Sequence, residues 1–254
     1  MPDDVPPDRR PDTYDALAPI YDALGGESFA LRVLERLRPL LAAIEVEASA
    51  PSFLDLGCGT GTLLLSVGVE RPHWRLVGLD ASAGMLAAAV QKPGHQAVLW
   101  TRARLPGPLP FRDRFDLIGA FYDTLNHLPD EVALAASFRA VAALLRPGGR
   151  LVFDLNNAFG FERWWQHRVA LDVGDRRLET RLHYDARART GRAEMTLSGP
   201  GGPQRLLLTE RCFSEAEVRD ALAQAGLTLE IAAPWRYLQD GTPSKTWFEA
   251  AFRR

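Results

Sequence analysis

The sequence has little of what secreted, membrane-spanning or nucleic-acid-binding proteins usually show. Only two cysteines, Cys58 and Cys212, occur among 254 residues, which excludes a disulfide framework, and no Cys/His spacing matches a zinc site. No apolar run is long enough to span a bilayer, and residues 1–12, rich in proline and aspartate, lack the apolar core of a signal peptide. We therefore expect a cytoplasmic protein with a disordered N-terminus and no membrane partner.

Charge of one sign is not in excess either. The chain has 30 basic and 32 acidic residues, which gives a formal net charge of -2. Dedicated nucleic-acid-binding proteins usually have a strong basic excess, so nucleic acid is not an expected partner. Hydrophobic residues make up 46% of the chain, enough for a sizeable core.

The sequence does have strands and helices in alternation over its first 155 residues. A short apolar segment runs directly into a glycine-rich turn, and acids or glycines close several of the later segments. Strands are predicted at residues 53–56, 75–80, 96–101, 115–121 and 150–155. A long helix beginning after Asp130 is predicted to turn Val132, Phe138 and Val141 inward. This order is typical of an α/β protein with a parallel nucleotide-binding sheet.

The periodicity changes after the fifth strand. Between Val169 and Cys212, apolar and polar residues alternate with period two, which predicts an antiparallel insertion with one apolar face. There are two alternatives for that face: it covers the pocket of its own chain, or it pairs with a second copy of the chain to form a homodimer. A helix capped by Ser214 and two more strands follow. We divide the chain into a disordered N-terminus (1–12), an N-terminal helical cap (13–50), an α/β domain (51–160 and 213–254) and an inserted antiparallel β lid (161–212).

The glycine turn has the chemistry of a nucleotide site. Glycines remove side chains where backbone must approach a ligand, and the following helix directs its N-terminal N–H groups to the same place. Asp80 ends the next strand, about 20 residues on, where a carboxylate can bind a ribose diol. The dinucleotide frame Gly-x-Gly-x-x-Gly ends on Thr62 instead of glycine, and the Walker A lysine is absent. A nicotinamide-dependent oxidoreductase remains the alternative from another enzyme class.

Three segments closely resemble motifs of the class I S-adenosylmethionine-dependent methyltransferases. In chain order they are residues 55–61 (DLGCGTG), similar to the family's cofactor loop, 78–86 (GLDASAGML), similar to its ribose and adenine segment, and 145–149 (LRPGG), similar to its turn before the fifth strand. The segments 14–22 (YDALAPIYD) and 122–128 (YDTLNHL) are similar to small-molecule methyltransferases, including sugar N,N-dimethyltransferases. The resemblance implies a Rossmann-like seven-stranded sheet with a reversed last strand, helices on both faces and a β lid after the fifth strand.

The resemblance also implies S-adenosyl-L-methionine as the cofactor, S-adenosyl-L-homocysteine as the product, no metal, and a small-molecule acceptor methylated on nitrogen or oxygen. The implied cofactor-binding residues are Tyr14, Tyr21, Asp55, Gly57, Cys58, Gly59, Gly61, Asp80, Ala81, Met85, Ala103 and Phe121. Among them, Tyr14 and Tyr21 are implied to donate hydroxyl hydrogen bonds to the methionine carboxylate of the cofactor. Relatives commonly carry an Asp after the third strand that meets the adenine amino group, and residues 101–104 (TRAR) have no acid. We expect a backbone contact near Ala103 and packing by Met85 instead.

His127 is the candidate catalytic base, because it follows the fourth strand at the carboxyl edge of the sheet and its ordinary pKa of about 6.5 suits proton uptake near neutrality. The candidate acceptor-binding residues are Tyr122, Asp123, Trp164 and Trp165. Methyl transfer needs mainly alignment, so a non-catalytic module that only binds S-adenosylmethionine is a further alternative.

Overall fold

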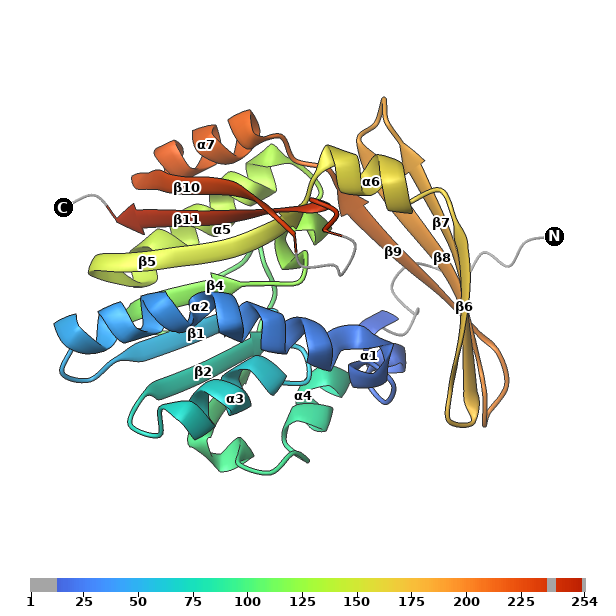
Figure 1. Ribbon diagram of the computed structural model, residues 1–254, viewed down its shortest axis with the longest axis horizontal. Helices are drawn as coiled ribbons and strands as arrows, with labels where there is room; N and C mark the ends of the chain where they lie inside the picture. The colour runs from blue at the N-terminus through green and yellow to red at the C-terminus, as the bar shows by residue number, and fades with distance from the viewer. Residues whose placement is uncertain (1–12, 237–240, 253–254) are drawn as a thin grey trace.

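The computed structural model describes residues 13–236 and 241–252, so the disorder predicted for residues 1–12 lies outside the described residues. In this part of the chain, no helix combines the length and the apolar character that crossing a membrane requires. The molecule contains two β-sheets (Figure 1). The larger sheet is flanked by helices, and the smaller sheet lies beyond one edge of the larger one.

The larger sheet has seven strands in the order β10-β11-β5-β4-β1-β2-β3. The strands are β1 (Ser52–Leu56), β2 (Arg75–Asp80), β3 (Val98–Arg102), β4 (Phe115–Ala120), β5 (Leu145–Asn156), β10 (Leu227–Trp235) and β11 (Lys245–Phe252). Neighbours among β1 to β5 pair in parallel, whereas β11 is antiparallel to both β5 and β10. The predicted seven-stranded sheet with a reversed last strand is confirmed, and the carboxyl ends of its parallel strands meet at one edge.

Helices cover both faces of this sheet. The helices α2 (Glu27–Glu47) and α3 (Thr62–Glu70) lie on one face, and α5 (Glu131–Leu144) and α7 (Glu215–Gln224) lie on the other. Strand β1 is buried along its whole length, because Phe53 packs into the core with α2 and α3 while Leu54 packs into the core with α5 and α7. Burial on both faces explains why this strand is apolar without alternation.

The inward face of α5 differs from the prediction at one residue. Val132 is 69% exposed, whereas Leu134, Phe138 and Val141 are buried. An α-helix turns by about 100° per residue, so Val132 points about 200° away from Leu134, into solvent. The cap was predicted correctly, since the Asp130 side chain accepts a hydrogen bond from the N–H of Ala133 at 2.8 Å.

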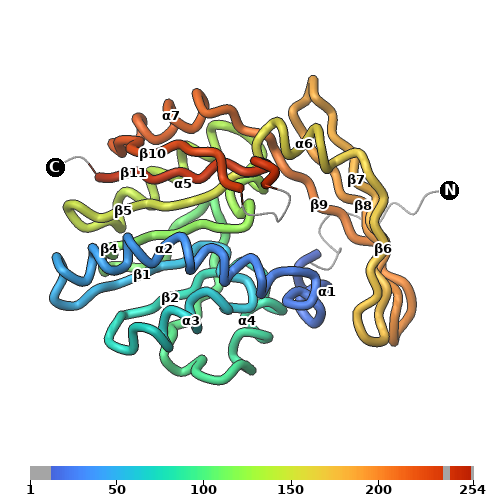
Figure 2. The backbone as a smooth tube through the Cα atoms, viewed as in Figure 1, coloured from blue at the N-terminus to red at the C-terminus, as the bar shows by residue number. Residues whose placement is uncertain are grey.

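The N-terminal segment leads across the carboxyl edge of the larger sheet. Helix α1 (Thr13–Leu17) ends two residues before Pro19, and the π-helical turn η2 (Asp22–Gly26) connects it to α2. Helix α1 contacts α4 (Ala83–Ala89) and the second sheet (Figure 2). This segment therefore covers the edge at which the cofactor loop lies.

The second sheet follows β5 in the chain, as predicted, and is separate from the first. Its four antiparallel strands are β6 (Arg168–Val173), β7 (Arg176–Asp185), β8 (Thr190–Ser198) and β9 (Gln204–Arg211). Apolar residues on one face of this lid pack with Leu17 and Ile20 from the N-terminal segment and with Phe161 of α6 (Ala158–Trp164). The lid thus lies beyond the carboxyl edge of the larger sheet, beside α1 (Figure 1).

Candidate active site

The cofactor loop (residues 57–61) connects β1 to α3 and folds tightly against the end of β2. Gly57, Gly59 and Gly61 have positive φ angles of 71°, 55° and 76°, which residues with side chains rarely adopt. The main-chain N–H groups of Gly57 and Cys58 donate to the carbonyl oxygen of Leu79, at 2.7 and 3.0 Å. The loop is therefore a tight turn anchored to the neighbouring strand.

Two of these glycines are required for different reasons. A Cβ atom on Gly57 would collide with the side chain of Thr124, in the turn η4 (Thr124–His127) that follows β4. A Cβ atom on Gly61 would collide with the Trp100 ring of β3, and Gly61 lines neither of the two cavities described next. Gly57 brings the loop against the β4–α5 connection, whereas Gly61 allows α3 to pack against the sheet.

A cavity lies between the cofactor loop, α1 and loop 121–128 at the carboxyl edge of the sheet. Its lining includes the predicted cofactor-binding residues Gly57, Gly59, Asp80, Ala81, Met85 and Ala103. It also includes Tyr14, Tyr21, Phe121, Tyr122 and His127. The fold therefore brings the predicted cofactor residues and the predicted base to one central cavity.

A smaller cavity behind the cofactor loop is lined by Asp55 and Cys58. Asp55 is 3% exposed, and its Oδ1 atom has no hydrogen-bond partner among the described residues. Burial, with a further contribution from the Asp80 charge, raises the pKa of Asp55 well above its usual value. A buried acceptor without a partner is costly, and an ammonium group of a ligand would satisfy it. This orphan oxygen fits the amino group of a methionine moiety.

The Asp80 carboxylate organises the cofactor loop. Its Oδ2 accepts a hydrogen bond from the N–H of Gly59, and its Oδ1 accepts one from the N–H of Ser82, both at 2.8 Å. Each carboxylate oxygen can accept two hydrogen bonds, so the same side chain can hold the loop and meet ribose hydroxyls.

The segment expected to meet adenine, residues 101–104, has two arginines and no acid. Arg104 lines the cavity, and Arg102 donates from Nε to the carbonyl oxygen of Ala81 at 3.1 Å. The N–H of Ala103 donates to the main-chain oxygen of Asp80, also at 3.1 Å. This N–H is already hydrogen-bonded within the protein. The expected backbone contact between Ala103 and adenine would therefore use the carbonyl oxygen of Ala103.

Two acids fix the N-terminal segment over the cofactor loop. Asp15 Oδ1 accepts from the Ser82 hydroxyl at 2.5 Å and from the N–H of Gly84 at 2.8 Å. Asp22 accepts from the Thr60 hydroxyl at 2.5 Å and forms an ion pair with Lys92 at 2.6 Å. These contacts place Tyr14 and Tyr21, which neighbour the two acids in sequence, above the cavity.

The Tyr14 hydroxyl meets the predicted base directly. It lies 2.8 Å from Nε2 of His127, and Nδ1 of His127 lies 3.3 Å from the carbonyl oxygen of Thr209 in β9. A carbonyl only accepts, so Nδ1 carries the hydrogen and Nε2 is the acceptor for the Tyr14 O–H. Burial, with a further contribution from the Asp123 charge, raises the pKa of Tyr14 well above its usual value, so this hydroxyl stays protonated.

Loop 121–128 takes a strained path that an ion-pair cluster stabilises. Tyr122 and Asp123 both have positive φ angles, of 54° and 57°. Their N–H groups donate to the Asp154 carboxylate at 2.7 and 3.3 Å. Lys245, 1% exposed, bridges Asp123 at 2.8 Å and Asp154 at 2.9 Å. Tyr122 lines the cavity, whereas the predicted acceptor-binding residue Asp123 turns toward Lys245.

Sequence reasoning missed three residues of this cluster: Asp154, Glu210 and Lys245. Asp154 lies near the carboxyl end of β5, as Asp55 does in β1 and Asp80 in β2, so its position was a usable signal. Nothing in the sequence marked Glu210 or Lys245. One ligand atom each from Asp123, His127 and Glu210 lie within 4.8 Å of one another. Lys245 neutralises this group in part and binds an oxygen of Asp123, so we continue to predict no metal.

The two predicted tryptophans lie at the base of the lid and line neither cavity. Trp165 is 9% exposed, and its ring centroid lies 5.1 Å from that of Phe161. The Arg163 guanidinium lies 5.0 Å from the centre of the Trp164 ring. Both side chains therefore have packing partners of their own, and their contact with an acceptor stays a prediction.

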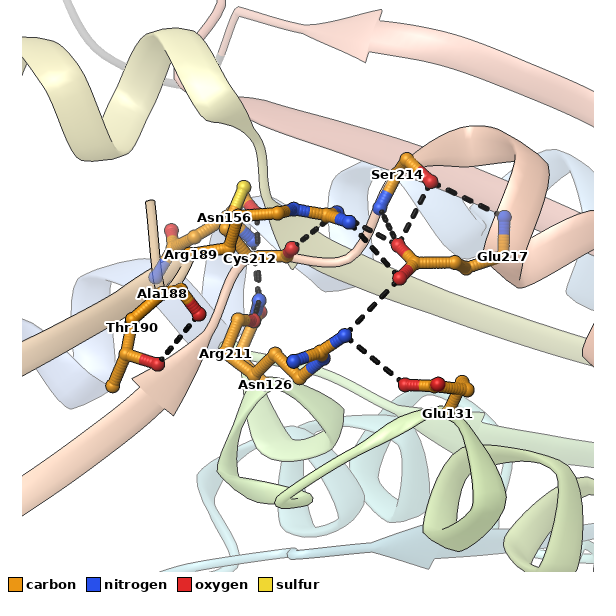
Figure 3. A network of polar contacts seen from close by, with 10 residues as sticks. All are labelled: Asn126, Glu131, Asn156, Ala188, Arg189, Thr190, Arg211, Cys212, Ser214 and Glu217. Carbon is orange, nitrogen blue, oxygen red and sulfur yellow. Dashed lines mark hydrogen bonds and ion pairs between the residues drawn. The ribbon is translucent and has the colours of Figure 1, made fainter. Parts of the chain in front are cut away.

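A polar network joins the lid to the α/β domain where β9 leads into α7 (Figure 3). Glu217 accepts two hydrogen bonds from Arg189, at 2.9 and 2.7 Å, and one from Arg211 at 3.2 Å. Arg211 also contacts Glu131 of α5 at 3.0 Å. Glu217 and Ser214 form a capping box at the start of α7. This junction fixes the end of β9, and with it Glu210, against the domain.

Comparison with known proteins agrees with this geometry. Residues 53–149 match a family model described as a methyltransferase domain. The chain is 34% identical over 149 residues to the ubiquinone/menaquinone biosynthesis C-methyltransferase UbiE of Syntrophotalea carbinolica, a match that covers 57% of this chain and 60% of that protein. The chain spans 47 to 63% of the length of the first curated relatives that it matches.

Solved structures extend the likeness over nearly the whole chain. An S-adenosylmethionine-dependent methyltransferase from Clostridium acetobutylicum superposes with a TM-score of 0.75 at 19% identity, covering 95% of this chain and 99% of the other. The sugar N-methyltransferase KedS8 from a Streptoalloteichus species gives a TM-score of 0.67 at 23% identity, with coverages of 100% and 98%. Residues 53–149 thus match a methyltransferase domain, and the chain has the fold of the class I S-adenosylmethionine-dependent methyltransferases.

Proposed function

We propose that this protein transfers a methyl group from S-adenosyl-L-methionine to a nitrogen or oxygen atom of a small-molecule acceptor and releases S-adenosyl-L-homocysteine. The observation that carries the proposal is the contact between Tyr14 and His127, which line the same cavity as the cofactor loop. A site that only stored the cofactor has no need of a proton acceptor there.

The residues present fit this cofactor. The orphan oxygen of Asp55 suits the ammonium group, Asp80 suits the ribose hydroxyls, and Met85 offers an apolar surface to adenine. When bound, S-adenosylmethionine supplies an electrophilic methyl group on its sulfonium centre. Tyr14 has a single hydroxyl proton and donates it to His127, so we assign the hydrogen bond to the methionine carboxylate to Tyr21 instead.

The protein's part in the reaction is alignment and removal of one proton. Alignment in a closed cavity contributes on the order of 7–11 kcal/mol to lowering the barrier, and general-base assistance about 10²- to 10⁴-fold. The acceptor N–H or O–H loses its proton to the Tyr14 oxygen while the Tyr14 proton moves to Nε2 of His127. The resulting imidazolium keeps its Nδ1–H on Thr209 and faces the Asp123 carboxylate.

The named relatives carry out related reactions on different atoms. UbiE is named a C-methyltransferase, a relative from Hahella chejuensis a malonyl-[acyl-carrier protein] O-methyltransferase, and KedS8 a sugar N-methyltransferase. We favour nitrogen or oxygen here because the Tyr14–His127 pair is suited to accept a proton from a heteroatom, and nitrogen first because the likeness to KedS8 covers 100% of this chain and 98% of that protein.

The experiment that tests this proposal is product detection with the purified full chain. S-adenosylmethionine is supplied with a panel of amino sugars, simple amines and polyols, and methylated products and S-adenosylhomocysteine are quantified by mass spectrometry. Turnover that His127→Asn reduces at least about 10-fold supports the proposal. A thermal shift with NADH or NADPH but not with S-adenosylhomocysteine would favour the nicotinamide alternative. Tight S-adenosylhomocysteine binding without turnover across the panel would favour a non-catalytic module.

We also propose a cytoplasmic location and a homodimer formed through the lid. Val169 and Leu171 on the lid's edge strand β6 are 41% and 44% exposed, and exposed apolar residues on an edge strand suit pairing. Light scattering of the wild type and of a Leu171→Lys variant tests the dimer. A monomeric wild type would exclude it.

A further inference from the structure

Glu210 is a lid side chain that reaches the back of the proton-accepting site. It lies on β9, next to Thr209, whose carbonyl contacts His127, and it is only 4% exposed. Its Oε2 accepts a hydrogen bond from Nδ2 of Asn156 at 2.8 Å. One oxygen of its carboxyl group lies within 4.8 Å of one of Asp123, and a hydrogen bond between the two groups contributes to the pKa of each. One lid residue thus joins β5 to loop 121–128.

Two carboxyl groups form a hydrogen bond only if they share a proton, since carboxylates only accept. Around this pair, Asp123 and Asp154 surround the single ammonium of Lys245, which already leaves one net negative charge. A third buried carboxylate would be strongly disfavoured. The pair therefore holds one proton.

The proton belongs to Glu210. Burial and the Asp123 charge raise the pKa of Glu210 well above its usual value. Burial also acts to raise the pKa of Asp123, but the Lys245 ammonium and the hydrogen bonds from Lys245 and Glu210 outweigh it and lower that pKa. The other ionisable groups that act on this cluster are His127, Asp154 and Lys245. Tyr122 and Asp80 act on the neighbouring Tyr14.

We propose that Glu210 is a positioning residue, a neutral carboxylic acid that holds the Asp123 carboxylate beside His127, so that the lid completes the proton-accepting end of the site. Asp123 beside the ring favours the imidazolium that proton uptake creates. Glu210 and Lys245 both donate to this carboxylate, which fixes its orientation. The inference rests on the proposed methyl transfer, but it makes a claim about charge that does not need turnover to be tested.

The matched variants are Glu210→Gln, Glu210→Ala and Glu194→Gln. A glutamine reproduces both hydrogen bonds of a protonated Glu210, because its NH₂ donates to Asp123 and its oxygen accepts from Asn156. Glu194 is an exposed carboxylate of the lid strand β8 and serves as the control. We expect Glu210→Ala to lower kcat on the order of 10- to 100-fold with S-adenosylhomocysteine affinity unchanged, Glu210→Gln to restore most of the loss, and Glu194→Gln to match the wild type. If Glu210→Gln is as impaired as Glu210→Ala, or if Glu210→Ala matches the wild type, the proposal is wrong.

An NMR titration of His127 provides the second measurement, with the signal assigned through His127→Asn. Asp123→Asn should lower the His127 pKa by about one unit, because it removes an opposite charge near the ring. Glu210→Gln should leave this pKa at the wild-type value, because no charge is removed. If Glu210→Gln lowers it as much as Asp123→Asn does, Glu210 is ionised and the proposal fails. A wild type that turns over no acceptor would contradict the proposed function, while this titration would still decide the state of Glu210.

Discussion

The Tyr14 hydroxyl and Nε2 of His127 lie 2.8 Å apart although 113 residues separate them, and their rings meet edge-on with centroids 5.5 Å apart. Tyr14 belongs to the N-terminal segment that Asp15 fixes to the start of α4. The contact therefore exists only when this segment covers the cavity. The same segment thus covers the cavity and supplies one member of the proposed proton-accepting pair.

This relationship predicts that Tyr14→Phe and His127→Asn act on the same step. Each substitution should lower kcat on the order of 10- to 100-fold, because each removes one end of the proton path. The double variant should be little worse than either single variant, since groups that act as a unit give non-additive losses. Steady-state kinetics at saturating S-adenosylmethionine measures all three.

Tyr14→Phe also separates the two roles considered for this tyrosine. Calorimetry should show an S-adenosylhomocysteine affinity close to that of the wild type, because Tyr21 is assigned to the methionine carboxylate. Multiplicative losses in the double variant would contradict the shared step. A large loss of affinity in Tyr14→Phe would instead indicate that Tyr14, and not Tyr21, donates the hydrogen bond to the methionine carboxylate.

Much of the fold was predictable because its signals are local. The apolar run before Gly57, the acid at the end of β2 and the period-two pattern of the lid each lie within one element, and each was read correctly. The Lys245–Asp123 ion pair joins residues 122 positions apart in the sequence. No local sequence pattern predicts such a contact. The packing role of Gly61 was hidden for the same reason, because the Trp100 ring that fills the space comes from another strand.

Asp80→Asn should weaken S-adenosylhomocysteine binding about 10- to 100-fold, the equivalent of losing one or two hydrogen bonds to a charged group. An amide keeps one acceptor oxygen, but its NH₂ group would face one of the N–H groups of Gly59 and Ser82 that the carboxylate now binds. Isothermal titration calorimetry measures the affinity. The control is Asp113→Asn, whose side chain is 78% exposed in the wild type. If both variants bind S-adenosylhomocysteine with equal affinity, Asp80 does not contribute to cofactor binding.

Asp55→Asn should make the protein without ligand more stable at pH 8 and weaken its binding of S-adenosylmethionine. The folded-state pKa of Asp55 is raised, so folding favours the protonated form. Wild-type stability is then lost as pH rises from the unfolded-state pKa of about 3.9 toward the raised value, and asparagine is exempt from this loss. The melting temperature of Asp55→Asn should exceed that of the wild type at pH 8, with the difference shrinking toward pH 5. A difference that does not vary with pH would contradict the titration of Asp55.

The lid junction predicts the opposite pH dependence. Burial opposes ionisation of Glu217, but hydrogen bonds from Arg189 and from Ser214 outweigh it and lower the pKa of Glu217 to about 2. A lowered folded-state pKa contributes stability above the unfolded-state value of 4.5, and this contribution is lost as pH falls toward 2. Glu217→Gln should therefore melt below the wild type at pH 7, with the gap closing as pH falls from 4.5 toward 2. The control is Glu215→Gln, whose ion pair with Arg219 has side chains 55% and 57% exposed and should contribute little. If both glutamine variants melt alike at pH 7, the Arg189–Glu217–Arg211 network does not hold the lid to the domain.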